Sequence, residues 1–477
     1  MDHLLAKPKL TSPAANKEFL SQYLKVHVQN GLTSPKKAIE IIVSELGCKI
    51  SQTTASEALG IAISKLTYDV NKGYNHLTEY VRITNASGGL AKLTTIPFEF
   101  DRNFDNDNES EAVNEVPLNS FNKIFISLLY QRSVGRYASF VSFDASHRKG
   151  KSKGMIMAAS TQDLNGDTKK ETDGQVTILA HAIVPAEDYE NWLYFLNCFK
   201  EAFPNMMAKF FISDRDKGLI KAIKEVFPEI PHSKCLRHLS ENFKKKFHSQ
   251  EMTDILKIMA LAFKPEDFSS HMQVIKDNEM GDEMERWIAE NEPETWVRSK
   301  MSFNRFGISN SNSIEIVFSA IKEMRYLPTL DFLLSMETYI CENIFKKHLF
   351  ALTLQDKSLL PRIQAKLNTE IEQSVYYRIQ RTGYNTAVVT GTTIVRKYSV
   401  DTENYFCSCG QYQEKGYPCT HAAAFLISVG KNPQEFCHKI CYGEYQKRMF
   451  NISGNYRPTV LADLIGVQTT SNTYKLI

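Results

Sequence analysis

The sequence lacks any apolar run that approaches the roughly 18 residues required by a membrane-spanning helix. Its first residues, MDHLLAKPKLTSPAANKEF, lack the long apolar core that follows a basic start in a secretory signal peptide. No internal repeat or low-complexity segment is present. These absences predict an intracellular protein that has no membrane partner.

Cysteine is also scarce, with nine among 477 residues. Inside a cell these thiols stay reduced, so a cluster of them favours a metal site over a disulfide framework. The net charge is only +3, which does not by itself mark a nucleic-acid-binding protein. Two short basic clusters, HRKGKSKG (147–154) and FKKKFH (243–248), suit either phosphate contacts or an ordinary solvated surface.

The composition is that of a globular protein, with 43% hydrophobic and 23% charged residues, and the length predicts two to four domains. Residues 17–83 have helical periodicity, and SPKKAIEIIVSEL opens one helix with a cap and a proline. The polar stretch 100–117 predicts a loop at a domain boundary.

After this boundary the pattern changes to strands at 137–144, 154–161 and 175–184, followed by a helix, a strand (209–214) and another helix. This order predicts an α/β sheet with an antiparallel part. The next stretch, from 236 to 300, is mostly helical, and the strand pattern returns at 385–401.

A dense group of metal-binding residue types lies in CSCGQYQEKGYPCTH, where Cys407 and Cys409 form one pair and Cys419 and His421 another. Two close pairs joined by a turn-rich loop can close a tetrahedron around Zn²⁺. Such a site has no open position, so we expect a structural zinc. The pair Cys437 and Cys441 lacks a second half and is interpreted as packing.

Carboxylates follow two of the predicted strands: Asp144 in FVSFDAS and Asp214 in FFISDRD. Side chains at the carboxyl ends of strands in one sheet can converge, and Glu315 on a helix would complete a cage for two divalent ions. A strand-end Asp is also a common cap or turn former, and Glu315 stands where a capping-box glutamate would follow Asn312. The competitors that the pattern does not exclude are Asp163, Asp167 and Asp216.

Several stretches together resemble the Mutator-like transposases, a family of cut-and-paste DNA transposases with an RNase H-like catalytic core. FVSFDASHRKGKSKGMIMAASTQDLNG (140–166) and FFISDRDKGLIKAIKEVFPEIPHSKCLRHLSENFKKKF (210–247) are similar to the family's first- and second-aspartate blocks. ISNSNSIEIVFSAIKEMRYLP (308–328) resembles its glutamate block, and the cysteine cluster resembles the SWIM zinc finger that commonly follows the core. The resemblance covers most of about residues 30–450, in the expected order.

Carried over residue by residue, the resemblance makes Asp144, Asp214 and Glu315 the catalytic triad that holds two Mg²⁺ or Mn²⁺ ions. It makes Cys407, Cys409, Cys419 and His421 the ligands of a structural Zn²⁺. It also points to residues that would contact DNA or support the site, and these are Cys235, His238, Trp296, Lys149, Lys151, Lys244, Lys245 and Lys246. For Cys235 and His238 packing is the alternative, and Trp296 would either stack on an unpaired base or form a buried anchor.

The expected fold is an α/β RNase H-like core with a mixed sheet, interrupted by an all-α insertion, preceded by a helical domain and followed by a small zinc finger. The expected division is 1–118 (helical, DNA-binding), 119–247 (first part of the core), 248–305 (insertion), 306–384 (core completion), 385–430 (SWIM finger) and 431–477 (tail).

The function that the resemblance implies is DNA transposition in the nucleus. The enzyme would bind terminal inverted repeats of double-stranded DNA, cut the ends by two-metal hydrolysis and join the 3′-OH ends to target DNA, as a homodimer or larger assembly. One alternative is a domesticated, DNA-binding transcription regulator without catalysis. Another is a nuclease without strand transfer.

Overall fold

The structure is a computed structural model that describes ten ranges of the chain: 17–29, 35–66, 76–97, 119–149, 153–164, 176–309, 312–392, 396–452, 458–460 and 463–464. Within these ranges every helix is too short or too polar to cross a lipid bilayer. The expected boundary at 100–117 lies outside the described residues.

The described chain forms two sheets and many helices. The strands are β1 (Leu90–Pro97), β2 (Asn119–Ser127), β3 (Phe140–His147), β4 (Met155–Gln162), β5 (Val176–Val184), β6 (Phe210–Ser213), β7 (His232–Lys234), β8 (Tyr377–Arg381), β9 (Thr386–Gly391), β10 (Lys397–Asp401) and β11 (Phe406–Cys407). The α-helices are α1 (Lys17–Gln29), α2 (Pro35–Leu46), α3 (Gln52–Leu66), α5 (Leu77–Ala86), α6 (Leu129–Arg136), α7 (Tyr189–Ala202), α8 (Lys217–Val226), α9 (Leu236–Phe247), α10 (Gln250–Leu261), α11 (Pro265–Lys276), α12 (Gly281–Glu290), α13 (Asn312–Ala320), α14 (Thr329–Thr353), α15 (Pro361–Gln373), α16 (Gln411–Lys415), α17 (Thr420–Ser428) and α18 (Gly443–Met449).

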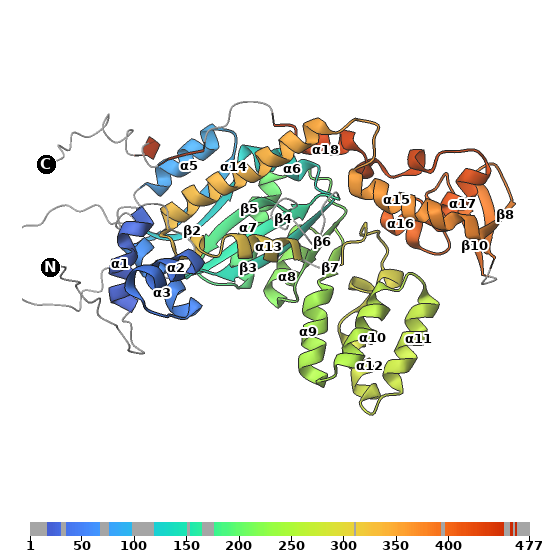
Figure 1. The fold of residues 1–477 in the computed structure, drawn as a ribbon, viewed down its shortest axis with the longest axis horizontal. Helices are drawn as coiled ribbons and strands as arrows, with labels where there is room; N and C mark the ends of the chain where they lie inside the picture. The colour runs from blue at the N-terminus through green and yellow to red at the C-terminus, as the bar shows by residue number, and fades with distance from the viewer. Residues whose placement is uncertain are drawn as a thin grey trace, which may run out of the picture.

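The larger sheet has seven strands in the order β1-β2-β5-β4-β3-β6-β7 (Figure 1). Strands β3, β4 and β5 are antiparallel neighbours, whereas β6 pairs parallel to β3 and β7 parallel to β6. The carboxyl ends of β3, β5 and β6 therefore lie toward the same edge of the sheet. This mixed arrangement confirms the expected α/β sheet with an antiparallel part.

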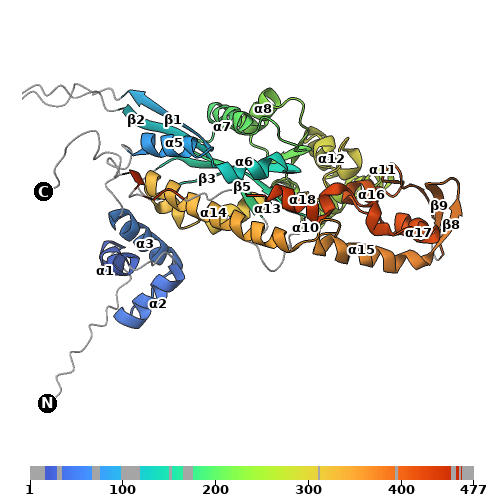
Figure 2. The ribbon, with the colours of Figure 1, turned by 90° about the horizontal axis from the view of Figure 1, so that it is seen from above.

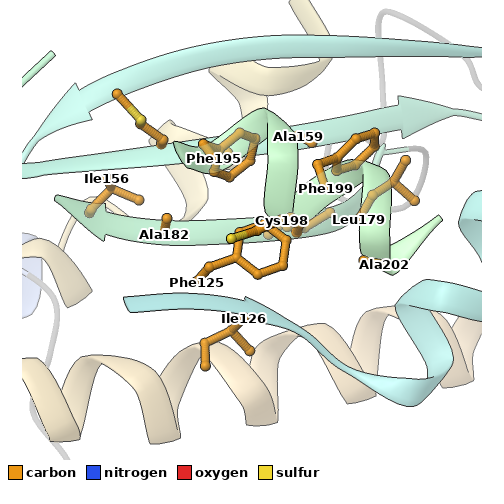
Figure 3. Close-up of a cluster of buried hydrophobic side chains, with 14 of the residues drawn as sticks. Phe125, Ile126, Ile156, Ala159, Leu179, Ala182, Phe195, Cys198, Phe199 and Ala202 are labelled. Atoms are coloured by element: carbon orange, nitrogen blue, oxygen red, sulfur yellow. The ribbon is translucent and has the colours of Figure 1, made fainter. Parts of the chain in front are cut away.

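Helices cover both faces of this sheet. Figure 2 shows α7 and α8 on one face and α13 and α14 on the other. Successive side chains of a strand point to opposite faces, and Figure 3 shows this for β2: Phe125 points toward Phe195 and Phe199 of α7, and Ile126 points away from them. The core of the domain thus lies on both sides of the sheet.

The segment before residue 118 is not helical throughout. Residues 90–97, expected to be part of a helical domain, form β1, which pairs antiparallel with β2. The physical reason is the alternation in LAKLTTIP, which includes β-branched residues and suits an edge strand. Helices α1, α2 and α3 do form a separate small bundle, visible at one end of the sheet in Figure 2.

Two further units follow the sheet strands. Helices α9 to α12 pack around their own core, which contains Phe243, Phe247, Trp287 and Trp296. Helices α10 to α12 lie in the range expected for the insertion (248–305), whereas α9 lies in the range expected for the first part of the core. Near the C-terminus, the four-stranded sheet β11-β10-β9-β8 packs with α16 and α17 around the cysteine cluster. The insertion ends at a linker over residues 301–309 that returns the chain to the face of the large sheet covered by α13.

Candidate active site and zinc centre

Asp144 and Asp214 lie level with each other on neighbouring parallel strands. In the β3–β6 pairing Phe143 is opposite Ser213, so the next residue on each chain is one of the two aspartates. The ring of Phe143 contacts Phe195, Phe199 and Phe211 on the α7 side of the sheet. Because side chains alternate along a strand, Asp144 points to the opposite face, where α13 contacts β3.

Glu315 lies in the first turn of α13, and its carboxylate contacts two residues of α9. Its carboxylate forms an ion pair with Arg237, and its Oε1 lies 3.3 Å from Nε2 of His238. His238 also interacts electrostatically with Asp144 and Asp214. One histidine therefore interacts with all three predicted carboxylates.

Backbone hydrogen bonds hold the two aspartates in place. Oδ1 of Asp144 accepts from the amide of Ala145 at 2.8 Å, and Oδ1 of Asp214 accepts from the amide of Asp216 at 3.0 Å. Burial raises the pKa of Asp144 to about 7, and the negative charge of Asp214 adds to this shift. Burial also raises the pKa of Asp214. Crowded, partly buried carboxylates of this kind are stabilised by a cation.

A fourth carboxylate, Glu187, belongs to the same group and was missed by the sequence analysis. It lies in the loop between β5 and α7, at the edge where β3 and β6 also end. Burial raises its pKa to about 7, and the charges of Asp214 and Asp216 contribute. The sequence offers no signal for it, because Asp188 next to it caps α7 and the pair resembles an ordinary helix start.

The C-x-x-H pair, Cys235 and His238, lies at the start of α9, next to the end of β6. The amide of Cys235 donates to the carbonyl of Ser213 at 2.7 Å, which ties the start of α9 to the end of β6. A hydrogen bond with Cys235 raises the pKa of His238, while burial opposes this shift. The DNA-contacting or active-site-supporting role of the pair stays a prediction, with packing as the alternative.

The predicted DNA-contacting lysines have different surroundings. Lys244, Lys245 and Lys246 are exposed in the last turn of α9, and Nζ of Lys246 lies 3.2 Å from Glu283. The ammonium of Lys149 lies 5.7 Å from the centre of the Tyr326 ring. Lys151 lies outside the described residues.

The prediction that Trp296 stacks on an unpaired base is wrong for this structure. Its side chain is 0% exposed in the core of the insertion, and its Nε1 donates to the carbonyl of Asn291 at 3.0 Å. A buried ring whose polar atom is already paired has no free face for a base. Trp296 is the anchor of a loop, which was the alternative interpretation.

Two of the three competing aspartates lie among the described residues, and each has a different partner. Asp216 caps α8, because its carboxylate accepts from the amide of Leu219 at 2.7 Å. Asp163 interacts with the buried Lys347. Asp167 lies outside the described residues.

The four predicted zinc ligands come together as expected. Cys407, Cys409, Cys419 and His421 are all buried, and their ligand atoms lie within 4.8 Å of one another. Sγ of Cys409 lies 3.5 Å from Sγ of Cys419, and Nδ1 of His421 lies 3.7 Å from Sγ of Cys407. Sulfur atoms around a tetrahedral zinc with bonds of about 2.3 Å are about 3.8 Å apart, so the cluster fits this ion.

The chemistry of the cluster also suits a metal. Hydrogen bonding with Cys407 and Cys419 lowers the pKa of Cys409, which favours the thiolate form that binds metals. Two tyrosine rings pack against the imidazole of His421. The ring of Tyr398 is stacked on it with centres 3.7 Å apart, and the ring of Tyr377 is edge-on with centres 4.8 Å apart. Among the described residues, no other set of three or more such groups, the carboxylates included, has ligand atoms this close together.

Comparison with protein families matches two segments of the chain. Residues 140–242 match the model of the MULE transposase domain, and residues 391–430 match the SWIM zinc finger. The chain carries a MULE transposase domain and a SWIM zinc finger. This combination is consistent with a Mutator-like transposase, as expected from the sequence. A search of curated proteins finds no match.

The matched segments contain most of the candidate site. The MULE domain runs from β3 to α9 and includes Asp144, Asp214, Cys235 and His238, whereas Glu315 lies beyond its end. The SWIM finger includes all four residues of the zinc cluster. A transposase domain implies DNA as the partner of this protein.

Proposed function

We propose that the protein is a cut-and-paste DNA transposase of the DDE type, with Asp144, Asp214 and Glu315 as its catalytic carboxylates. One observation carries the proposal: within the MULE domain, His238 interacts with Asp144 and Asp214 and lies 3.3 Å from Glu315. Residues that are far apart in the sequence thus meet at the carboxyl edge of one sheet. Ligands of open α/β sheets bind at this edge.

The same proposal includes an RNase H-like core. Strands β5, β4 and β3 are antiparallel neighbours, and β6 and β7 extend the sheet parallel to β3. This mixed sheet suits such a core, and α9 to α12 would be the insertion between the second aspartate and the glutamate. Carboxylate oxygens are the ligands that Mg²⁺ prefers, so the donor set fits this ion.

In this proposal the protein residues position ions and DNA. Divalent ions bound here would activate the attacking oxygen and stabilise the leaving oxygen. The amides of Ala145 and Asp216 hold one oxygen of each aspartate, which leaves the other oxygen for a cation. Arg237, which pairs with Glu315 in the structure, would turn to the scissile phosphate.

Two displacements would follow each other in the site. In the first, water attacks phosphorus, the P–O3′ bond at the element end breaks, and a free 3′-OH and a 5′-phosphate result. In the second, this 3′-OH attacks a phosphodiester of target DNA, whose own 3′ oxygen leaves and takes up a proton. In both steps an attacking oxygen and a leaving oxygen are positioned around one phosphorus, so one carboxylate site can serve both steps.

DNA binding would rest on several basic elements. Exposed Lys244, Lys245 and Lys246 on α9 and the partly buried Lys149 would contact phosphates, which gives salt-dependent affinity without reading sequence. We further propose that the protein acts in the nucleus and pairs two DNA ends as a dimer or larger assembly.

The test is cleavage and strand transfer on labelled DNA that carries the ends of the protein's own element, with Mg²⁺ or Mn²⁺. We expect wild type to cut and join, and Asp144→Asn, Asp214→Asn and Glu315→Gln each to lose at least about 100-fold in rate, because a metal ligand is removed. Asp216→Asn is the matched control, since asparagine keeps the helix cap and cutting should largely remain. Salt-sensitive binding without cutting in any variant would favour the transcription regulator instead.

A further inference from the structure

We propose that the cavity between the large sheet and the SWIM finger binds an unpaired nucleobase of the DNA substrate. The cavity has a volume of about 370 Å³ and lies at the opposite end of β6 from Asp214. Its lining residues come from the start of β6, from the linker that follows the insertion, from the SWIM finger and from the segment after the finger. They are Lys209, Phe303, Asn304, Phe306, Asn404, Tyr405, Tyr412, Gln413, Gly416 and His438.

Aromatic rings dominate the lining. Tyr412 is fully buried, and Tyr405 is 42% exposed. Their rings pack edge-on with centres 5.9 Å apart. On another wall, the rings of Phe306 and His438 have centres 5.3 Å apart. Every base has a flat π-face, so ring-lined pockets bind unpaired bases whatever their sequence.

The polar groups of the cavity suit a nucleotide as well. None of the lining residues is acidic, and the exposed Lys209 supplies a positive charge at the rim. The side chains of Lys209 and Asn304 are both exposed at the cavity. A cation for a phosphate and an amide for a base edge are thus both available.

The backbone at the cavity is strained. Among the described residues, four non-glycine residues have a positive φ, and two of them, Phe306 and Tyr405, line this cavity with φ of 52° each. Left-handed backbone is unfavourable for an ordinary side chain, and such residues gather at binding sites. Gly416 has φ of 75° and lets the ring of Phe306 lie over it, since a Cβ there would meet that ring at 3.1 Å.

The cavity lies within reach of DNA bound at the carboxylates. Lys209 precedes β6 and Asp214 follows it, a separation of roughly 16 Å along an extended strand. That length corresponds to about five nucleotides of one DNA strand. The inference rests on the proposed DNA-binding function, and it adds a site for a base that is displaced from the duplex near a cut end.

The test uses the full-length protein without divalent metal, so that binding is measured apart from cleavage. The probes are a short blunt duplex and the same duplex with a few unpaired nucleotides, one of them 2-aminopurine, whose fluorescence falls when it stacks. The key variant is Tyr405→Gly, because it removes the ring and glycine readily accepts the positive φ at this position. Tyr384→Ala, on a side chain that is 87% exposed between β8 and β9, is the control.

We expect Tyr405→Gly to weaken binding of the extended probe about 5- to 100-fold and to abolish the fall in fluorescence, while blunt-duplex binding stays within twofold. Lys209→Gln should weaken the extended probe less and reduce its salt dependence. Tyr384→Ala should change neither probe. Equal affinity of Tyr405→Gly and wild type for the extended probe would overturn the proposal, and so would equal weakening for both probes. Absence of binding to either DNA would overturn the proposed function itself.

Discussion

Glu414 connects the SWIM finger to the helical insertion through a buried ionic cluster. It lies on α16, is 4% exposed, and accepts from Nε of Arg298 at 3.1 Å and from the amide of Arg305 at 2.9 Å. Arg305 is 0% exposed, and burial lowers its pKa to about 10. Around this cluster, Phe263 of the insertion packs against Gly410 of the finger.

Replacing Glu414 by alanine should therefore be costly. It removes the carboxylate that pairs with Arg298 and leaves that partly buried arginine beside the fully buried Arg305. Breaking a buried pair in this way costs about 3–5 kcal/mol. Glu414→Gln keeps an acceptor for the amide of Arg305 and should lose less. In the double variant with Arg298→Met, part of the loss should be recovered, because one of the uncompensated charges is gone.

The assay is native-state hydrogen exchange, because a multi-domain chain does not have one unfolding free energy. The amides of α10 and α11 and that of Arg305 should exchange at least about 100-fold faster in Glu414→Ala, which corresponds to about 3 kcal/mol, whereas amides of β4 and β5 should not change. A change below about 0.5 kcal/mol at α10 and α11 would refute the reasoning that this cluster holds the insertion against the finger.

Three further predictions concern pH and metals. His181 is 0% exposed and burial lowers its pKa to about 3, so below about pH 6.5 the unfolded chain binds a proton that the folded chain does not. The stability of the large sheet should therefore fall as pH drops, by about 2 kcal/mol at pH 5 from this residue, and His181→Leu should remove this contribution in hydrogen exchange of the β5 amides. Cys419→Ser should lose the bound zinc measured by metal analysis, whereas Cys437→Ser, at a buried cysteine outside the cluster, should keep it. Glu187→Gln should raise the Mg²⁺ concentration needed for half-maximal DNA cutting, and an unchanged Mg²⁺ dependence would exclude Glu187 from the metal site.

The zinc site was predictable because its geometry is local. All four ligands lie within fifteen residues, and a turn-rich loop is enough to bring the two pairs together. The convergence of Asp144 and Asp214 was also predictable, because both follow strands of one sheet. Their register, however, depends on the parallel β3–β6 pairing, which no single stretch of sequence determines.

The remaining features depend on long-range packing. Glu187 joins the carboxylates only because β5 runs in the same direction as β3, and its own sequence shows no more than the start of a helix. Burial of Trp296 depends on α9 to α12 closing around it. Strand β1 was missed because its pairing partner, β2, lies beyond a long polar stretch.

The most direct test of the central claim is metal rescue at Asp214. A thiolate is a poor ligand for Mg²⁺ and a better one for Mn²⁺, so the activity of Asp214→Cys should depend on which metal is supplied. We predict that wild type cuts the ends of its element with either ion, and that Asp214→Cys cuts only with Mn²⁺. If Asp214→Cys cuts equally well with both ions, or if wild type cuts with neither, the account of Asp214 as a metal ligand of a transposase is contradicted.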